Sequence, residues 1–207
     1  MKIKSLVSSL VAVVLATTVI ATVTASPVVG QPAPDFTLTD INGVTHTLSS
    51  FQGRTVVLEW VNPECPFVVK HYDKSGNIPA TQKAARDQGV VWLLINSGHP
   101  GAQGDFDKAK VDAWMVRTGA SADAYFRDQD GKIGKLYDAR TTPHMYIIDA
   151  TGTLVYAGGI DDIRSSNPAD IAKATNYVTV GLAEMSAGKA ISTNTSRPYG
   201  CSVKYSN

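Results

Sequence analysis

Two buried strand patterns, each associated with a helical pattern, constrain the fold of this chain most strongly. Residues 55–60 and 90–96 are apolar runs rich in β-branched and aromatic residues, as expected for strands covered on both faces. Helical patterns at residues 80–88 and 106–118 alternate with them. This alternation predicts an α/β fold in which helices cover both faces of a central sheet.

Shorter patterns predict two β-hairpins. Residues 36–38 and 45–48 flank the turn residues 40–43, which predicts a hairpin near the N-terminus. Residues 145–149 and 154–158 flank a second turn in the same way. The remaining predicted elements are a helix opening at 66–71 and interrupted by Gly76 and Pro79, a strand at 125–126, a short helix at 131–137, and a helix from Asn167 to about Ala187.

The first 25 residues have the pattern of a secretory signal peptide. Lys2 and Lys4 are followed by an uncharged apolar stretch at 6–20 and by small residues at 23–25. We therefore predict cleavage after Ala25 and export to the periplasm or the extracellular space. The alternative is an uncleaved membrane anchor, for which the apolar stretch is close to the minimum length. Only in that case do we expect contact with a membrane.

Composition limits the functions of the remaining chain. The 207 residues contain 19 Lys and Arg against 18 Asp and Glu, so no basic excess indicates a nucleic-acid partner. The chain has two cysteines, Cys65 and Cys201, which excludes a four-thiolate zinc or iron–sulfur site within one chain. We predict no metal and no cofactor. Residues 26–187 are expected to form one domain, followed by a polar tail at 188–207 that carries Cys201.

Cys65 is the main candidate for chemistry. It follows the strand pattern at 55–60 and precedes Pro66, a residue favoured in the first turn of a helix. Free backbone N–H groups at a helix start stabilise a thiolate, which is the nucleophilic form of cysteine. Cys65 is therefore a candidate nucleophile. The alternative is an inert buried cysteine, which is common in protein cores.

These features resemble the thioredoxin-like superfamily. A strand–Cys–Pro–helix segment and a later Thr142-Pro143 segment before a strand occur in the order and spacing typical of that superfamily. Residues 32–38 resemble the N-terminal hairpin of its peroxiredoxin branch. The similarity covers the chain after Gln31 and is greatest to peroxiredoxin-like (AhpC/TSA-type) redoxin proteins, through the segments 65–72, 142–145, 159–162 and 200–205.

The resemblance implies a thioredoxin-like fold with a central mixed sheet. It also implies an enzyme, a thiol-dependent oxidoreductase in which Cys65 attacks either a protein disulfide or a peroxide and is restored by an external thiol reductant. A cis bond between Thr142 and Pro143 would present backbone groups of Thr142 to an extended substrate. The residues that we expect to contact substrate are Thr142, Pro143, His144, Pro66 and Trp60.

The chain departs from both related patterns. Thioredoxins carry a second cysteine three residues after the first, and here that residue is Val68. Peroxiredoxins carry Thr or Ser where this chain has Asn62, and their peroxide-binding Arg falls near Pro143. Arg140 is a candidate substitute for that Arg, and His71 is a further candidate auxiliary residue.

Cys201 is the remaining thiol available to resolve an oxidised Cys65. Gly200 and the polar residues around it suggest a segment flexible enough to move. Two other functions stay open at this point. In the first, the chain is a non-catalytic thioredoxin-like module that binds a partner through the surface of Cys65 and Pro143. In the second, a Cys65–Cys201 disulfide is structural and only holds the tail in place.

Overall fold

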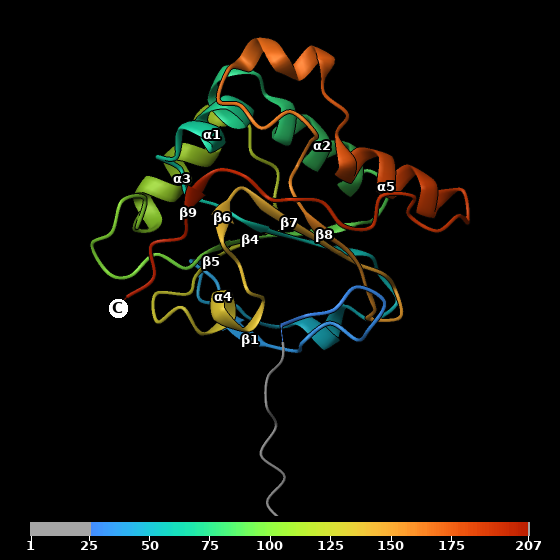
Figure 1. Cartoon of the computed structure of the whole chain (residues 1–207). Helices are drawn as coiled ribbons and strands as arrows, with labels where there is room; N and C mark the ends of the chain where they lie inside the picture. Colours follow the sequence, from blue (N-terminus) through green and yellow to red (C-terminus); the bar gives the residue numbers. More distant parts are fainter. Residues whose placement is uncertain (1–25, 207) are drawn as a thin grey trace, which may run out of the picture.

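A five-stranded mixed sheet forms the centre of the molecule (Figure 1). The computed structural model describes residues 26–206, so the predicted signal peptide lies outside the described part of the chain. The strands follow the order β5-β4-β3-β7-β8, in which β3, β4 and β5 are parallel and β7 is antiparallel to both β3 and β8. Their bounds are β3 Val56–Trp60, β4 Val91–Asn96, β5 Ala124–Arg127, β7 His144–Ile148 and β8 Leu154–Gly158.

Four helices cover one face of this sheet (Figure 1). The core beneath them is built from alternate strand residues such as Val57, Trp92 and Met145, together with Trp114 and Leu182 from the helices. This alternation follows from the period of two in a β-strand. The helices are α1 Pro66–Val69, α2 Asn77–Arg86, α3 Lys108–Thr118 and α5 Tyr177–Ser186.

The opposite face is covered by the N-terminal hairpin and one short helix. Strands β1 Thr37–Thr39 and β2 Thr45–Thr47 form the predicted hairpin, a 3-10 turn spans Leu48–Phe51, and α4 covers Lys132–Leu136. The second core lies between these elements and the sheet. The predicted α/β class with both faces covered is therefore confirmed. The residues of this core include Phe36, Leu48, Leu58, Trp60, Tyr137 and Tyr146.

The predicted interruption at Pro79 is wrong. After α1 the chain continues through a π-helical turn at Lys70–Lys74, and α2 begins at Asn77, so Pro79 is its third residue. A proline is tolerated there because the first turn of a helix needs no intrahelical N–H donor. The break lies at Gly76, whose φ of 63° is in the left-handed region.

The predicted single helix from Asn167 to Ala187 is also wrong. Asn167 does cap a helix, but this is only a 3-10 segment at Pro168–Lys173. A second cap, Asn176, then accepts hydrogen bonds from the N–H groups of Val178 and Thr179 and starts α5. The break arises because the backbone N–H of Tyr177 bonds to the carbonyl of Ile160, which redirects the chain.

The C-terminal tail is held to the rest of the molecule by backbone hydrogen bonds, although many of its residues are exposed. It first runs along the edge strand β8, where the N–H of Ala157 donates to the carbonyl of Asn194 at 3.2 Å. It then crosses the helical face and forms strand β9, Cys201–Ser202, antiparallel to β6, Thr141–Thr142 (Figure 1). Backbone pairing therefore fixes the tail beside the segment that contains Pro143.

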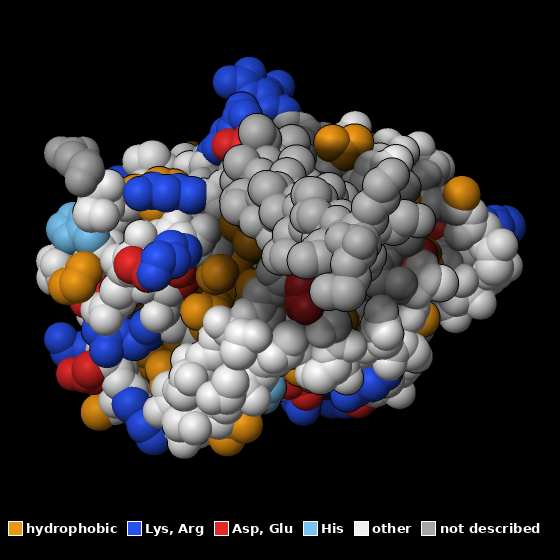
Figure 2. All heavy atoms as spheres, turned by 90° about the horizontal axis from the view of Figure 1, so that it is seen from below, with side chains coloured by type: hydrophobic (Ala, Val, Ile, Leu, Met, Phe, Trp, Pro, Cys, Tyr) orange, Lys and Arg blue, Asp and Glu red, His pale blue; other side chains and the backbone are white. Residues whose placement is uncertain are grey.

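Charges of both signs are interspersed on the face of the molecule seen in Figure 2, where Lys and Arg side chains lie among Asp and Glu side chains. This distribution agrees with the formal net charge of +1. Within residues 26–206, no helix has the length and apolar character needed to cross a membrane.

Candidate active site

A tight turn presents Cys65 at the start of α1. The N–H of Cys65 donates to the carbonyl of Asn62 at 3.0 Å, and the N–H of Glu64 donates to Oδ1 of Asn62 at 2.9 Å. Cys65 is the N-cap residue, with extended φ and ψ of −71° and 126°, and Pro66 follows in the first turn. The predicted position of Cys65 at a helix start is confirmed.

The side chain of Asn62 stabilises this turn. Its amide Nδ2 donates to the carbonyl of Gln103 at 3.1 Å, and the N–H of Gly104 donates to Oε2 of Glu64 at 2.6 Å. A Cβ atom at Gly104 would lie 1.9 Å from Oδ1 of Asn62, so glycine is required at that close approach. Asn62 therefore links the Cys65 turn to the loop between β4 and α3, and both ends of its amide are used in backbone contacts.

The sulfur of Cys65 is surrounded by backbone groups from two distant segments. The Cys65 side chain has no exposed surface. Its Sγ–H donates to the carbonyl of Thr142 at 3.1 Å, and the N–H of Cys201 donates to Sγ at 3.4 Å. The β6–β9 ladder places Thr142 opposite Cys201. Both cysteines are free thiols, so the structure shows the reduced form.

The surroundings of Cys201 disfavour its ionised form. Burial, followed by the hydrogen bond to Cys65 and the charge of that group, raises the pKa of Cys201 to about 12. Two of these three causes disappear when the sulfur of Cys65 enters a disulfide.

Gly200 allows the tail to approach this closely. Its φ is 141°, and a Cβ atom there would lie 2.0 Å from the carbonyl oxygen of Thr142. A residue with a side chain would push the tail away from Thr142 and Cys65. Close packing against Thr142 is thus a role of Gly200 that the sequence did not reveal.

The Thr142–Pro143 peptide bond is cis, and both residues are buried. His144, however, faces away from Cys65, because alternation along β7 places it with Tyr146 on the hairpin face. Its Nδ1 lies 3.1 Å from the hydroxyl of Tyr146 and accepts the N–H of Arg140 at 3.4 Å. Burial lowers the pKa of His144 to about 3.

Trp60 also belongs to the opposite face of the sheet. Its Nε1–H donates to the hydroxyl of Ser97 at 3.0 Å, and its ring packs against Tyr137 and Tyr146. Trp60 is completely buried in that second core. The predicted contact of Trp60 and His144 with substrate is therefore not supported by their placement, because neighbouring positions on a strand face opposite sides. Pro66 is exposed beside Cys65, at the start of α1.

The two predicted auxiliary residues have other partners. The exposed guanidinium of Arg140 pairs with Asp138 at 2.5 Å. His71 is fully buried, with Nε2 3.1 Å from the hydroxyl of Tyr199 and Nδ1 3.0 Å from the amide of Asn77. These contacts occupy both ring nitrogens of His71, so neither auxiliary residue is positioned by its contacts to act on Cys65. Among the described residues, no group of three or more Cys, His, Asp or Glu side chains is arranged to hold a metal ion.

A buried carboxyl group, which was not anticipated, lies on the helical face of the sheet. Glu59 on β3 accepts hydrogen bonds from the hydroxyl of Tyr72 and the indole N–H of Trp92, each at 2.9 Å, and from Gln82 at 3.4 Å. Burial raises the pKa of Glu59 to about 7, although these donors act in the opposite direction. The sequence signal was an acidic residue inside an otherwise apolar strand.

The chain is similar to known redox proteins. Residues 29–157 match the model of the AhpC/TSA family. The thiol-disulfide oxidoreductase ResA of Geobacillus kaustophilus is 31% identical over 131 residues, which cover 60% of this chain and 65% of that protein. The chain therefore matches less than two thirds of the length of this curated relative.

Solved structures share the fold. A hypothetical protein from Sinorhizobium meliloti 1021 is 27% identical, with a TM-score of 0.69, and the match covers 88% of this chain and 97% of that one. The thioredoxin domain of a thiol-disulfide oxidoreductase from Bacteroides vulgatus has a TM-score of 0.51 at 17% identity, covering 72% and 97% of the two chains. The predicted thioredoxin-like fold is confirmed, and the family match over most of the described chain shows that this protein belongs to the AhpC/TSA family.

Proposed function

We propose that this protein is an exported thiol-disulfide oxidoreductase in which Cys65 attacks and Cys201 of the same chain resolves. The observation that carries the proposal is the meeting of the two cysteines at Thr142, where the N–H of Cys201 lies 3.4 Å from the sulfur of Cys65. The curated relative named above is a thiol-disulfide oxidoreductase, which supports the same reaction class. Export rests on the signal pattern of residues 1–25.

The reaction has two exchange steps. The thiolate of Cys65 attacks a substrate disulfide, forms a mixed disulfide and releases one substrate thiolate. The thiol of Cys201 then loses its proton and attacks the sulfur of Cys65, which releases the second substrate thiol and leaves a Cys65–Cys201 disulfide. The substrate gains two electrons and the protein loses them. An external dithiol restores both cysteines and is itself oxidised to a disulfide.

Disulfide exchange is favoured over peroxide reduction by the contacts around Cys65. A peroxide site of the peroxiredoxin type needs a cation near the sulfur, whereas the Arg140 guanidinium is exposed and paired with Asp138. In contrast, the backbone of Thr141–Thr142 offers an edge that already holds an extended segment, the tail strand β9. A peptide substrate can use the same edge when β9 moves away.

A turnover assay tests the proposal. The purified protein is mixed with a dithiol reductant and a peptide that contains one disulfide, and release of the peptide thiols is followed. We expect turnover by wild type, none by Cys65→Ser, and, when the reductant is left out, a mixed disulfide of Cys65 that persists in Cys201→Ser. Equal activity of wild type and Cys65→Ser would show that the protein is a binding module or that its cysteines are structural.

A further inference from the structure

The tail has a second buried contact, two residues before Cys201. The side chain of Tyr199 is 6% exposed and inserts between α1 and the loop after β8. Its ring packs edge-on against Phe67, with ring centroids 5.8 Å apart, and the ammonium of Lys70 lies 5.7 Å from the ring centre. The proposed function gives no role to this contact.

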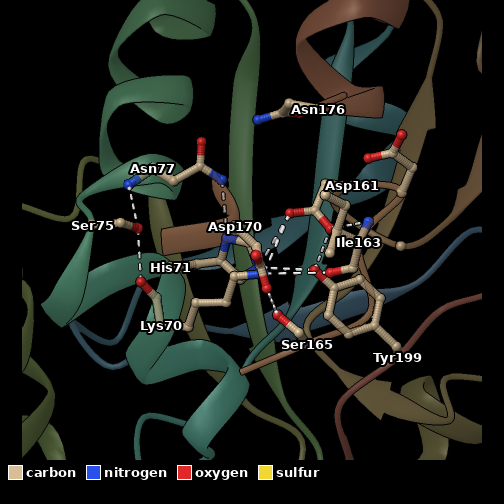
Figure 3. A network of polar contacts seen from close by, with 12 residues as sticks. Lys70, His71, Ser75, Asn77, Asp161, Ile163, Ser165, Asp170, Asn176 and Tyr199 are labelled. Carbon is tan, nitrogen blue, oxygen red and sulfur yellow. Dashed lines mark hydrogen bonds and ion pairs between the residues drawn. The ribbon is translucent and has the colours of Figure 1, made fainter. Parts of the chain in front are cut away.

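The hydroxyl of Tyr199 joins a buried polar network (Figure 3). It donates a hydrogen bond to Oδ1 of Asp161 and lies 3.1 Å from Nε2 of His71. Because the hydroxyl proton points to Asp161, its oxygen accepts the Nε2–H of His71. The other ring nitrogen of His71 then accepts from the amide of Asn77 at 3.0 Å. Every donor in this chain of hydrogen bonds therefore has an acceptor.

The network is charged and excluded from water. Lys70, His71 and Asp161 are at most 2% exposed. The ammonium of Lys70 lies 3.7 Å from Oδ2 of Asp161 and donates to the carbonyl of Ile163 at 3.4 Å. Hydrogen bonds to charged groups in such surroundings are stronger than those between neutral groups. The Tyr199 hydroxyl thus makes a strong attachment between the tail and this buried network.

The geometry links this attachment to the cysteines. Cys65 begins α1, and Lys70 and His71 lie in the π-helical turn that continues it, so one helical segment carries both groups. On the tail, Tyr199 and Cys201 are separated only by Gly200. Fixing Tyr199 against His71 and Asp161 therefore restricts where Cys201 can lie relative to Cys65.

We propose that Tyr199 is the positioning residue of this redox centre, a latch whose hydroxyl, bonded to Asp161 and His71, holds Gly200 and Cys201 over Cys65. Two effects follow. The latch shields the reduced Cys65 sulfur from outside reagents, and it keeps Cys201 close enough to capture Cys65 quickly after the first exchange step. The second effect rests on the proposed function, and the first does not.

The test compares Tyr199→Phe, which keeps the ring and removes the hydroxyl, with Tyr205→Phe as a matched control. Tyr205 lies in the same tail and donates to the carbonyl of Ala139 at 2.7 Å, outside the charged network. Two rates are measured by mass spectrometry of quenched samples: alkylation of Cys65 in the reduced protein, and formation of the Cys65–Cys201 disulfide after addition of oxidised glutathione. Thermal unfolding establishes that each variant is folded.

For Tyr199→Phe we expect alkylation of Cys65 to rise about tenfold and capture by Cys201 to slow about tenfold, as expected for loss of a hydrogen bond to a charged group. Tyr205→Phe should stay within about twofold of wild type in both rates. The comparison with Tyr205→Phe separates this effect from general loosening of the tail. If Tyr199→Phe fails to fold, Asp161→Asn weakens the same acceptor while keeping its volume and should shift both rates in the same senses by smaller factors.

The outcomes separate the two proposals. If wild type forms the Cys65–Cys201 disulfide and Tyr199→Phe matches it in both rates, the latch is wrong and the proposed function stands. If wild type never forms that disulfide, the proposed function is wrong, and the alkylation rate alone decides whether Tyr199 holds the tail. Equal effects of Tyr199→Phe and Tyr205→Phe would also overturn the latch, because they would reflect general loosening of the tail.

Discussion

The backbone N–H of Cys201 donates to the sulfur of Cys65 at 3.4 Å, although 136 positions separate the two residues in the sequence. The same stretch of tail pairs with Thr142, whose carbonyl accepts the Sγ–H of Cys65 at 3.1 Å. The second thiol of this centre is therefore brought by backbone pairing from the far end of the chain. The position at which thioredoxins carry a local second cysteine is Val68 in this chain.

Replacing Gly200 by Ala should lift the tail from the active site. The added Cβ would lie 2.0 Å from the carbonyl oxygen of Thr142, and the backbone at Gly200 has a φ of 141°. We expect the alkylation rate of reduced Cys65 to rise and the unfolding free energy to fall by about 1–3 kcal/mol. Gly188→Ala is the matched control, because Gly188 lies in the tail with a φ of 70° and a Cβ added there would have no neighbour within 4 Å. Equal alkylation rates in the two variants would contradict the close-packing role of Gly200.

A cysteine introduced in place of Val68 should take over the proposed resolving role of Cys201. Val68 is buried in α1, three positions after Cys65, and residues three apart on a helix are neighbours. In a Cys201→Ser background, Val68→Cys should convert the stalled mixed disulfide into a bond between Cys65 and the introduced thiol, and should restore turnover. The measurement is peptide thiol release, with Lys132→Cys as the control at an exposed position on the opposite face of the sheet. If Val68→Cys leaves the stall unchanged, a thiol three residues after Cys65 does not resolve the mixed disulfide in this fold.

His144 should make the fold sensitive to acid. Burial lowers its pKa to about 3, whereas an unfolded chain has a histidine pKa near 6.5. Its stabilising contribution is therefore complete above pH 6.5 and is lost as the pH falls towards 3, which amounts to about 2 kcal/mol between pH 8 and pH 5. Urea unfolding of wild type and His144→Asn at both pH values measures this. The variant should lose about 2 kcal/mol less than wild type, and His99→Gln, at a more exposed ring, should behave as wild type does. Equal losses in wild type and His144→Asn would refute the assignment.

Glu59 should change the pH dependence of the unfolding free energy in the opposite direction to His144. Its pKa is raised to about 7 from an ordinary value of 4.5, so the folded state binds the proton more tightly than the unfolded state. The stabilisation is present below pH 4.5 and is lost as the pH rises to 7, with a magnitude on the order of 3 kcal/mol. Relative to wild type, Glu59→Gln should gain stability as the pH rises from 5 to 8. Urea unfolding across that range tests it, and a constant difference between the two proteins would show that Glu59 is not protonated in this way.

Much of the fold is predictable because strand burial and helix starts leave local signals. The apolar runs that became β3 and β4, and Pro66 after Cys65, need only neighbouring residues for their interpretation. The break before α5 depends instead on the hydrogen bond from Tyr177 to Ile160, a contact between segments that no local pattern encodes.

The tail was the part least accessible to prediction. Strand β9 has two residues, too few for a period of two to show, and its pairing with β6 is made by backbone groups. The burial of Lys70 and Asp161 was also not predictable from the sequence. Charged residues are usually exposed and become buried only with partners that the fold supplies. Prediction therefore located the candidate nucleophile but missed Tyr199 and the close-packing role of Gly200.

A disulfide map of the protein after one oxidation tests the central claim most directly. The reduced wild-type protein is treated at micromolar concentration with one equivalent of a small disulfide, then alkylated, digested and analysed by mass spectrometry. We expect a monomer in which the peptide containing Cys65 is bonded to the peptide containing Cys201. Cys65 remaining in a mixed disulfide with the reagent, with Cys201 alkylated in the same molecules, would contradict this claim.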